Sequence, residues 1–109
     1  MNTIERVLSF DNAGDFPQTP AFYRIYCVDP LTGYRSNCRF EGSALNLRDS
    51  LLVHFSLHEK DIPLRYFMLS CKEKLIEYIP MDDLDSAASL QTREEWVRKA
   101  PLKLQNCRV

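Results

Sequence analysis

Residues 21–57 read AFYRIYCVDPLTGYRSNCRFEGSALNLRDSLLVHFSL, and the spacing of the apolar residues changes once along this stretch. Two runs, 22–28 and 34–40, are rich in aromatic and other apolar residues at strand-like spacing. Between them, residues 29–33 supply turn chemistry, and Gly33 can take the positive φ that a tight turn needs. This part of the sequence therefore predicts a β-hairpin.

The second run alternates between two faces, as expected of a strand that is buried on one side. The residues expected to point inward are Tyr34, Ser36, Cys38 and Phe40. The residues expected to point outward are Arg35, Asn37, Arg39 and Glu41. In the first run both faces are largely apolar, so only Arg24 marks the side that is expected to be exposed.

From Ala44 to Phe55 the apolar residues recur at three- and four-residue spacing, which predicts an amphipathic helix. This helix is expected to begin at an N-cap, Ser43, and to end between His58 and Asp61. A hairpin that leads directly into such a helix resembles the opening unit of the ubiquitin-like, or β-grasp, fold.

The rest of the chain predicts a second hairpin, a second helix and a final strand. Their ranges are 66–71 and 75–79 for the hairpin, 89–100 for the helix and 102–107 for the strand. Residues 1–20 are expected to form a flexible N-terminal arm that lays a short strand on a domain spanning 21–109. The predicted order is ββαββαβ, an α+β fold in which a mixed sheet packs on one main helix.

The composition is that of a globular domain, with 45% hydrophobic and 27% charged residues and a net charge of −1. This charge gives no general attraction to nucleic acid. No apolar run approaches the roughly 20 residues of a membrane span, and the first residues lack the layout of a signal peptide. The four cysteines contain no CxxC pair, so we expect free thiols in a soluble, cytoplasmic protein.

No motif in the sequence predicts a catalytic residue, a cofactor or a metal. His54 and His58 lie one helical turn apart, but a third ligand and the glutamate of an HExxH arrangement are missing, which favours an ordinary surface pair. The acidic residues between 82 and 85 lack the glycine and closing glutamate of a calcium loop and predict a solvated turn. We therefore expect a protein that is not an enzyme.

The most informative polar group is basic and lies on the first predicted hairpin and helix. Arg35 and Arg39 share the outer face of the second strand, Arg24 lies near them across the hairpin, and Arg48 begins the helix. Such arginines can bind carboxylates of a partner while the unpaired strand edge accepts a further strand. The alternative is that they are charges on a solvated face that block edge-to-edge association.

The element order over about residues 21–107 resembles the ubiquitin-like GTPase-binding domains, which include Ras-association domains and the N-terminal modules of formins and of engulfment-and-motility scaffolds. The resemblance implies a non-catalytic module that binds a Ras- or Rho-type small GTPase in an actin regulator of the cell cortex or cytoskeleton. In these relatives the second strand pairs with the GTPase. The implied partner-binding residues are Arg24, Arg35, Asn37, Arg39 and Arg48.

A second function class also stays open. Trp96 lies in a charged frame similar to the closing helix of pleckstrin-homology domains. In this alternative the module docks on anionic membrane lipid or on a neighbouring domain, without binding a GTPase. The residues that would do so are Arg93, Arg98, Lys99 and Lys103.

Overall fold

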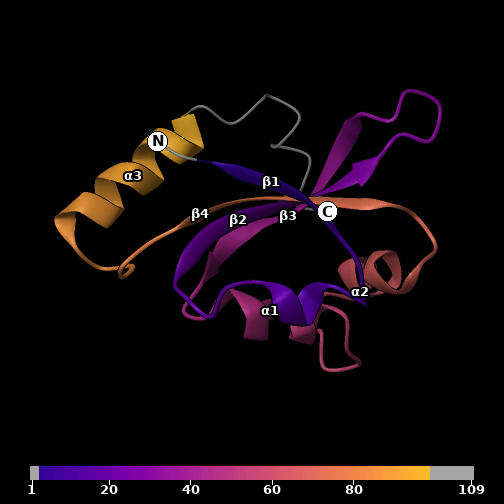
Figure 1. The fold of residues 1–109 in the computed structure, drawn as a ribbon, viewed down its shortest axis with the longest axis horizontal. Helices are drawn as coiled ribbons and strands as arrows, with labels where there is room; N and C mark the ends of the chain where they lie inside the picture. Colours follow the sequence, from indigo (N-terminus) through magenta and orange to yellow (C-terminus); the bar gives the residue numbers. More distant parts are fainter. Residues whose placement is uncertain (1–2, 99–109) are drawn as a thin grey trace.

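Four antiparallel strands form one open sheet in the order β1-β4-β2-β3 (Figure 1). The structure, a computed structural model, describes residues 3–98. Its strands are β1 (Ile4–Leu8), β2 (Ala21–Val28), β3 (Arg35–Ala44) and β4 (Lys74–Pro80). Its helices are the 3-10 turn η1 (Ala13–Asp15) and α1 (Leu47–His54), α2 (Ile62–Leu69) and α3 (Ala87–Arg98). The chain therefore has an α+β fold.

The predicted first hairpin is confirmed as β2 and β3. The turn between the strands uses the features that the sequence suggested, because Gly33 has a φ of 73° and the Asp29 side chain accepts a hydrogen bond from the backbone of Leu31. The register shifts twice between Ile25 and Val28, as bulges do. These shifts place Cys38 opposite Tyr26 and Phe40 opposite Ile25.

The predicted first helix is confirmed as α1, but it is shorter than expected. It begins at Leu47 because β3 continues to Ala44, and Asn46 rather than Ser43 is the N-cap. The Asn46 side chain accepts a hydrogen bond from the backbone of Asp49, as N-cap residues commonly do.

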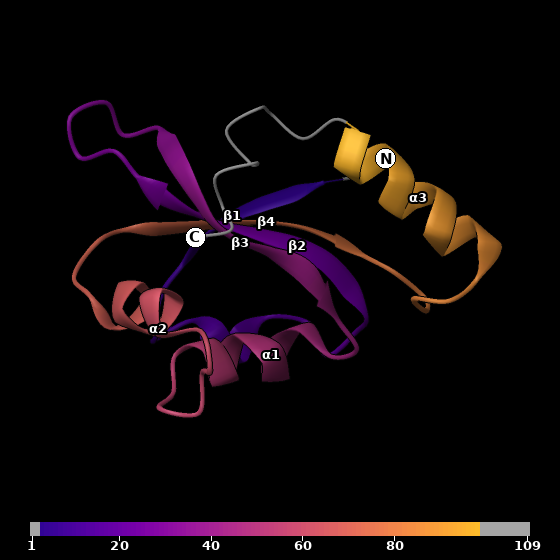
Figure 2. The same cartoon turned by 180° about the vertical axis from the view of Figure 1, so that it is seen from behind.

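Helices cover both faces of the sheet (Figures 1 and 2). α1 and α2 lie on one face, where the main core forms. α3 lies on the other face, where Trp96 packs against Phe22 and Ile79. Because β2 is central in the sheet and is covered on both faces, all eight of its residues are buried, which explains why the sequence showed two apolar faces.

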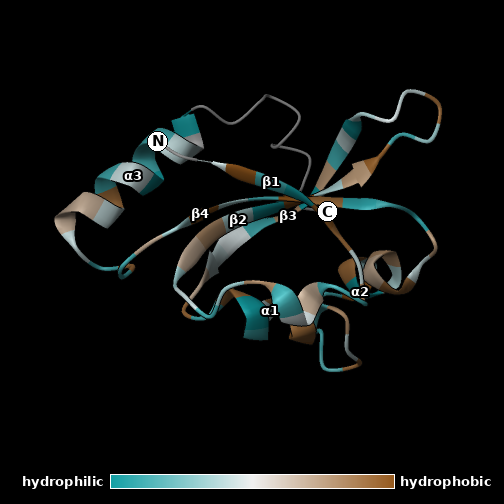
Figure 3. Cartoon of the chain, in the orientation of Figure 1, coloured by the Kyte–Doolittle hydropathy of each residue, from teal (hydrophilic) through white to brown (hydrophobic). Residues whose placement is uncertain are grey.

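Coloured by hydropathy, brown and teal stretches alternate along the strands, and teal segments also lie at turns and on α3 (Figure 3). The core on the side of α1 and α2 is built from aliphatic and aromatic side chains of the strands, η1, α1 and α2. Its largest fully buried members are Leu8, Tyr23, Ile25, Leu47, Leu51, Met68 and Ile76. This core fixes β2 and β3 relative to α1.

The strand predicted at 66–71 is wrong, because residues 62–69 form α2. Asp61 and Pro63 mark the beginning of this helix. The Asp61 side chain caps it by accepting a hydrogen bond from the backbone of Leu64, and Pro63 lies in the first turn, where its missing N–H costs little. The strand predicted at 75–79 is confirmed as β4, which pairs with β1 and β2 rather than within a second hairpin.

The segment before β2 is part of the folded domain. Residues 4–8 form β1, which pairs with β4 at the edge of the sheet. Ala13 and Phe16 are buried in the main core, and the guanidinium of Arg6 lies over the Phe16 ring. Residues 3–20 therefore complete the sheet and close one end of the core.

The predicted second helix is confirmed as α3 as far as Arg98. Its last two predicted residues and the strand predicted at 102–107 lie outside the described residues. The β-grasp order is not confirmed, because the described strands are all antiparallel and a helix takes the place of one predicted strand.

Gly42 of β3 allows a close ring contact that a side chain would prevent. A Cβ built at Gly42 would lie 2.9 Å from two atoms of the Phe40 ring, and that ring is held between Tyr23 and His54. We expect Gly42→Ala to lower the free energy of unfolding by about 1–2 kcal/mol, as overpacked sites do. Urea denaturation measures this change. Gly14→Ala is the control, because nothing lies within 4 Å of its Cβ, and equal effects of the two substitutions would contradict the prediction.

Candidate functional site

β3 forms one edge of the sheet and is the longest strand, with ten residues. One side of it pairs with β2 along most of its length, and no strand in the described part of the chain pairs with the other side. An unpaired edge presents backbone N–H and C=O groups to which an extended segment of another chain can hydrogen-bond. The residues of the predicted basic group lie on this strand and on the elements beside it.

Arg24 is buried, and the prediction that it is exposed is wrong. Only 3% of its surface is accessible, because α3 covers its side of the sheet. Its guanidinium carbon lies 3.7 Å from the centre of the Trp96 ring, and Nη2 donates a hydrogen bond of 2.7 Å to the Trp96 carbonyl oxygen. The carboxylates of Glu41 and Glu77 each lie 3.5 Å from Arg24 nitrogens. Arg24 is therefore available to no partner while α3 is docked.

Arg35 is half-exposed, and it is held on the same face of the sheet as Arg24. Its Nη1 lies 3.0 Å from Glu77 and 3.5 Å from Glu5, and its guanidinium lies over the Tyr26 ring. Burial raises the pKa of Tyr26, and the Glu77 carboxylate raises it further. Arg24 and Arg35 thus share Glu77, so both are already engaged by carboxylates of the domain.

Arg39 differs from these two arginines. Its guanidinium lies 5.1 Å from the centre of the Phe67 ring, on the face covered by α2. Its buried Nε has no hydrogen-bond partner, and no carboxylate of residues 3–98 lies within ion-pair distance. Asn37 is exposed on the same strand, and the guanidinium of Arg48 on α1 pairs with its neighbour, Asp49. The structure therefore divides the predicted basic group, and Arg39 is the arginine whose charge is left uncompensated on the edge strand.

His54 is buried rather than part of a surface pair, so that prediction is wrong. Its Nε2 lies 2.6 Å from the Tyr23 hydroxyl, its Nδ1 bonds the Glu59 carboxylate, and Phe40 packs on its ring. His58 is exposed. The signal was present in the sequence, because His54 follows Leu47 and Leu51 on one helical stripe.

Burial and the contacts within the Tyr23–His54–Glu59 chain shift the pKa values of Tyr23 and Glu59. Burial raises the pKa of Tyr23, and the Glu59 charge adds to this. For Glu59, burial acts to raise the pKa, but hydrogen bonds from the backbone of Asp61 and from His54 outweigh it and leave the pKa below the ordinary 4.5. Because Tyr23 is almost inaccessible, this chain joins β2, α1 and the following loop rather than meeting a substrate.

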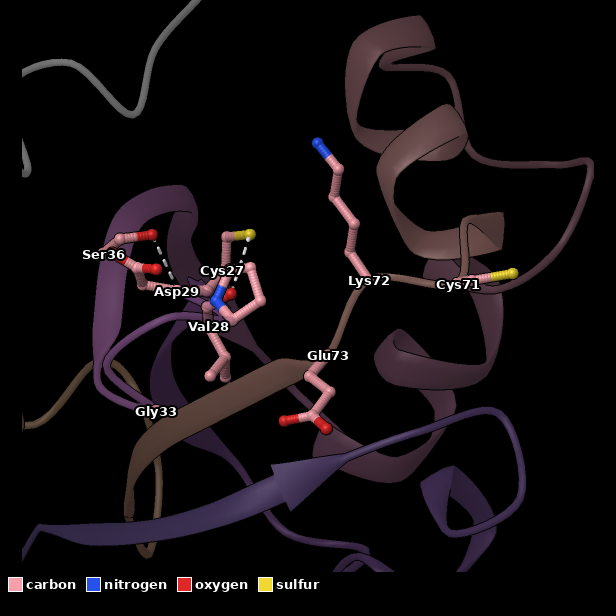
Figure 4. A pocket seen from close by; sticks show the side chains of 9 residues that line it. Cys27, Val28, Asp29, Gly33, Ser36, Cys71, Lys72 and Glu73 are labelled. Carbon is pink, nitrogen blue, oxygen red and sulfur yellow. Dashed lines mark hydrogen bonds between the residues drawn. The ribbon is translucent and has the colours of Figure 1, made fainter.

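A cavity of about 740 Å³ lies between the turn of the β2–β3 hairpin and the segment that joins α2 to β4 (Figure 4). Nine residues line it: Cys27, Val28, Asp29, Pro30, Gly33, Ser36, Cys71, Lys72 and Glu73. Its size is within the range of small-molecule sites. The Cys71 thiol is directed away from Cys27 in Figure 4, so the two do not act as a pair.

The thiols only partly follow the prediction. Cys27 and Cys71 are free, as expected, but Cys38 is disulfide-bonded, so the prediction of a free thiol there is wrong. Residues 3–98 contain no group of three or more potential metal-ligating side chains. Asp83 of the predicted acidic turn stabilises the segment that precedes α3, because its side chain accepts hydrogen bonds from the backbone N–H groups of Asp85 and Ser86.

The residues predicted for lipid docking lie partly outside the described chain. Arg93 and Arg98 are exposed on α3, and Arg98 pairs with Glu94 at 3.6 Å. Lys99 and Lys103 fall outside the described residues. The described part of α3 carries as many glutamates as arginines, so it has no basic face of its own.

The lowered pKa of Glu59 predicts a specific loss of stability in acid. A depressed pKa contributes stability that is fully present above the unfolded-state value and is lost as the pH falls through the folded-state value. We expect Glu59→Gln to be less stable than the wild type at pH 7, and the difference to shrink as the pH falls below about 4.5. Urea denaturation between pH 7 and pH 3 measures it, and a difference that is constant over this range would contradict the assignment.

Comparisons with known proteins do not assign this chain to a family. No protein-family model, no curated protein and no solved structure matches the chain. No helix within residues 3–98 is long and apolar enough to cross a membrane. The function is therefore inferred from the site alone.

Proposed function

We propose that this domain is a non-catalytic protein-binding module that accepts an extended segment of a partner along the free edge of β3. The observation that carries the proposal is the combination of a ten-residue edge strand, whose outer side pairs with no strand of residues 3–98, with Arg39, an arginine that has no carboxylate partner among the described residues. Strand addition provides backbone hydrogen bonds, and a partner carboxylate near Arg39 provides specificity.

The edge is well suited to this use because the domain holds it rigidly. Phe40 packs on Tyr23 and His54, so the middle of β3 is anchored to the core while no described strand pairs with its outer side. A partner strand therefore meets a preformed edge and does not have to order it, which reduces the entropic cost of association.

Within this class, the partner we propose is a Ras- or Rho-type small GTPase, bound by a module of an actin regulator such as a formin. Support comes from the order β2, β3, α1, which is also how ubiquitin-like GTPase-binding domains begin, and from Arg39 and Arg48 on the strand and helix that such domains use. The proposal does not depend on the order of the helices and strands that follow α1.

Lipid docking through α3 is the weaker alternative. Its two described arginines are balanced by Glu94 and Glu95, so charge does not favour an anionic surface there. Substitution of Arg93 on this helix therefore provides a control for the edge proposal.

The test is titration of the labelled 109-residue chain with a panel of Ras- and Rho-type GTPases, each loaded with GTP analogue or with GDP. We expect saturable binding that prefers the GTP form and weakens at least about tenfold in Arg39→Glu, as expected for loss of a charge-assisted contact. Arg39 is chosen over Arg35, whose substitution would also break the contacts with Glu77 and Glu5.

The matched control is Arg93→Glu, which makes the same charge change at an exposed position of α3. It should bind like the wild type. Flat titrations with every GTPase would reject the GTPase assignment, and binding weakened equally by both variants would reject β3 as the binding edge.

A further inference from the structure

Helix α3 is attached to the sheet through a small contact near one end. Trp96 is buried on Phe22 and Ile79, with Met81 and Leu84 at the margin of the cluster. Ser89 is the other residue of α3 that is described as buried, and its hydroxyl donates a hydrogen bond to the Asp83 carbonyl oxygen in the preceding segment instead of contacting the sheet. Several other residues of α3 are exposed: Ala87, Ala88, Leu90, Gln91, Arg93, Glu94 and Arg98. Among the side chains of α3 that the structure describes, Trp96 is thus the one that anchors the helix to the sheet.

The polar part of this contact is provided by Arg24. Its guanidinium stacks on the Trp96 ring and donates to the Trp96 carbonyl oxygen, whereas its ion pairs to Glu41 and Glu77 are long, at 3.5 Å each. Docking of α3 therefore removes the Arg24 guanidinium from water, and in exchange the guanidinium forms one short hydrogen bond and one ring contact. The free-energy cost of removing a charge from water offsets part of the stabilisation that these contacts provide.

Docking also leaves a donor unsatisfied. The indole Nε1 of Trp96 is buried and has no hydrogen-bond partner. In water this N–H would be hydrogen-bonded, so its burial weakens the docked state. The apolar contact of Trp96 with Phe22 and Ile79 must offset this loss together with the desolvation of Arg24.

The backbone contacts place a hinge before the helix. The backbone N–H of Met81 donates to Pro20 and its carbonyl oxygen accepts from the Thr19 hydroxyl, so Met81 is fixed to the body of the domain. Asp83 instead bonds forward, to Ser86 and to Ser89 of α3. Asp82 separates the part held by the sheet from the part that belongs to the helix.

From this geometry we propose that α3 is a latch that swings open about Asp82 as a unit while the four-stranded sheet stays folded. Opening exposes Phe22, Ile79 and Arg24 to solvent, because Trp96 covers all three in the docked state. This inference does not rest on the proposed function, because it concerns the face of the sheet under α3 and not the outer edge of β3.

The test is native-state hydrogen exchange of the full 109-residue chain over a series of low urea concentrations. We expect the amides of α3 to exchange at least about 100-fold faster than those of β2 and with a much weaker dependence on urea, as in local opening. Equal rates and equal urea dependence in α3 and β2 would show one cooperative unit and overturn the proposal.

A second measurement uses Trp96, the single tryptophan of the chain. Iodide should quench its fluorescence more effectively at urea concentrations at which the β2 amides remain fully protected. In Trp96→Ala the β2 amides should stay protected while the α3 amides lose protection. Loss of β2 protection in this variant would contradict a latch that is separable from the sheet.

Discussion

The burial of Arg24 is the constraint on which much of this structure depends. A guanidinium in the central strand has to be paired, and the neighbouring strands provide Glu41 on one side and Glu77 on the other. α3 then closes over the arginine with the ring and the carbonyl oxygen of Trp96. One side chain thereby links β3, β2, β4 and α3, and it requires the register that places these partners opposite one another.

The same arrangement explains which surface is left for a partner. Glu77 and Glu5 also hold Arg35, so both arginines on the face under α3 are paired with carboxylates of the domain. Arg39, on the edge strand whose outer side pairs with no described strand, lies over Phe67 without a carboxylate partner among the described residues. The division of the arginines between two faces thus separates a structural role from the binding role that we propose. Arg24 connects the two proposed features, because it pairs with Glu41 on the edge strand β3 and bonds Trp96 of α3.

The sequence predicted correctly those elements that short stretches of residues determine. The turn residues before Gly33 and the alternation in 34–40 identified the hairpin, and the spacing of Leu47 and Leu51 identified α1. The strand expected at 66–71 failed because an apolar run of that length fits a buried helix as well as a strand, and the capping role of Asp61 decided for the helix. The sequence identified the basic residues of the proposed site as candidates, but it predicted neither the burial of Arg24 nor the ion pairs of Arg35. Both depend on β4 pairing next to β2, a long-range contact that no local pattern encodes.

The most direct test of the role of Arg24 is a double-mutant cycle of Arg24→Met and Trp96→Leu, followed by circular dichroism during urea unfolding. The account predicts a coupling free energy of at least about 1 kcal/mol, as expected for a desolvated cation stacked on an indole ring. A reference cycle of Arg24→Met with Leu52→Ala, on α1 across the sheet, should be additive within about 0.5 kcal/mol. A coupling near zero between Arg24 and Trp96 would contradict the claim that this contact joins α3 to the sheet.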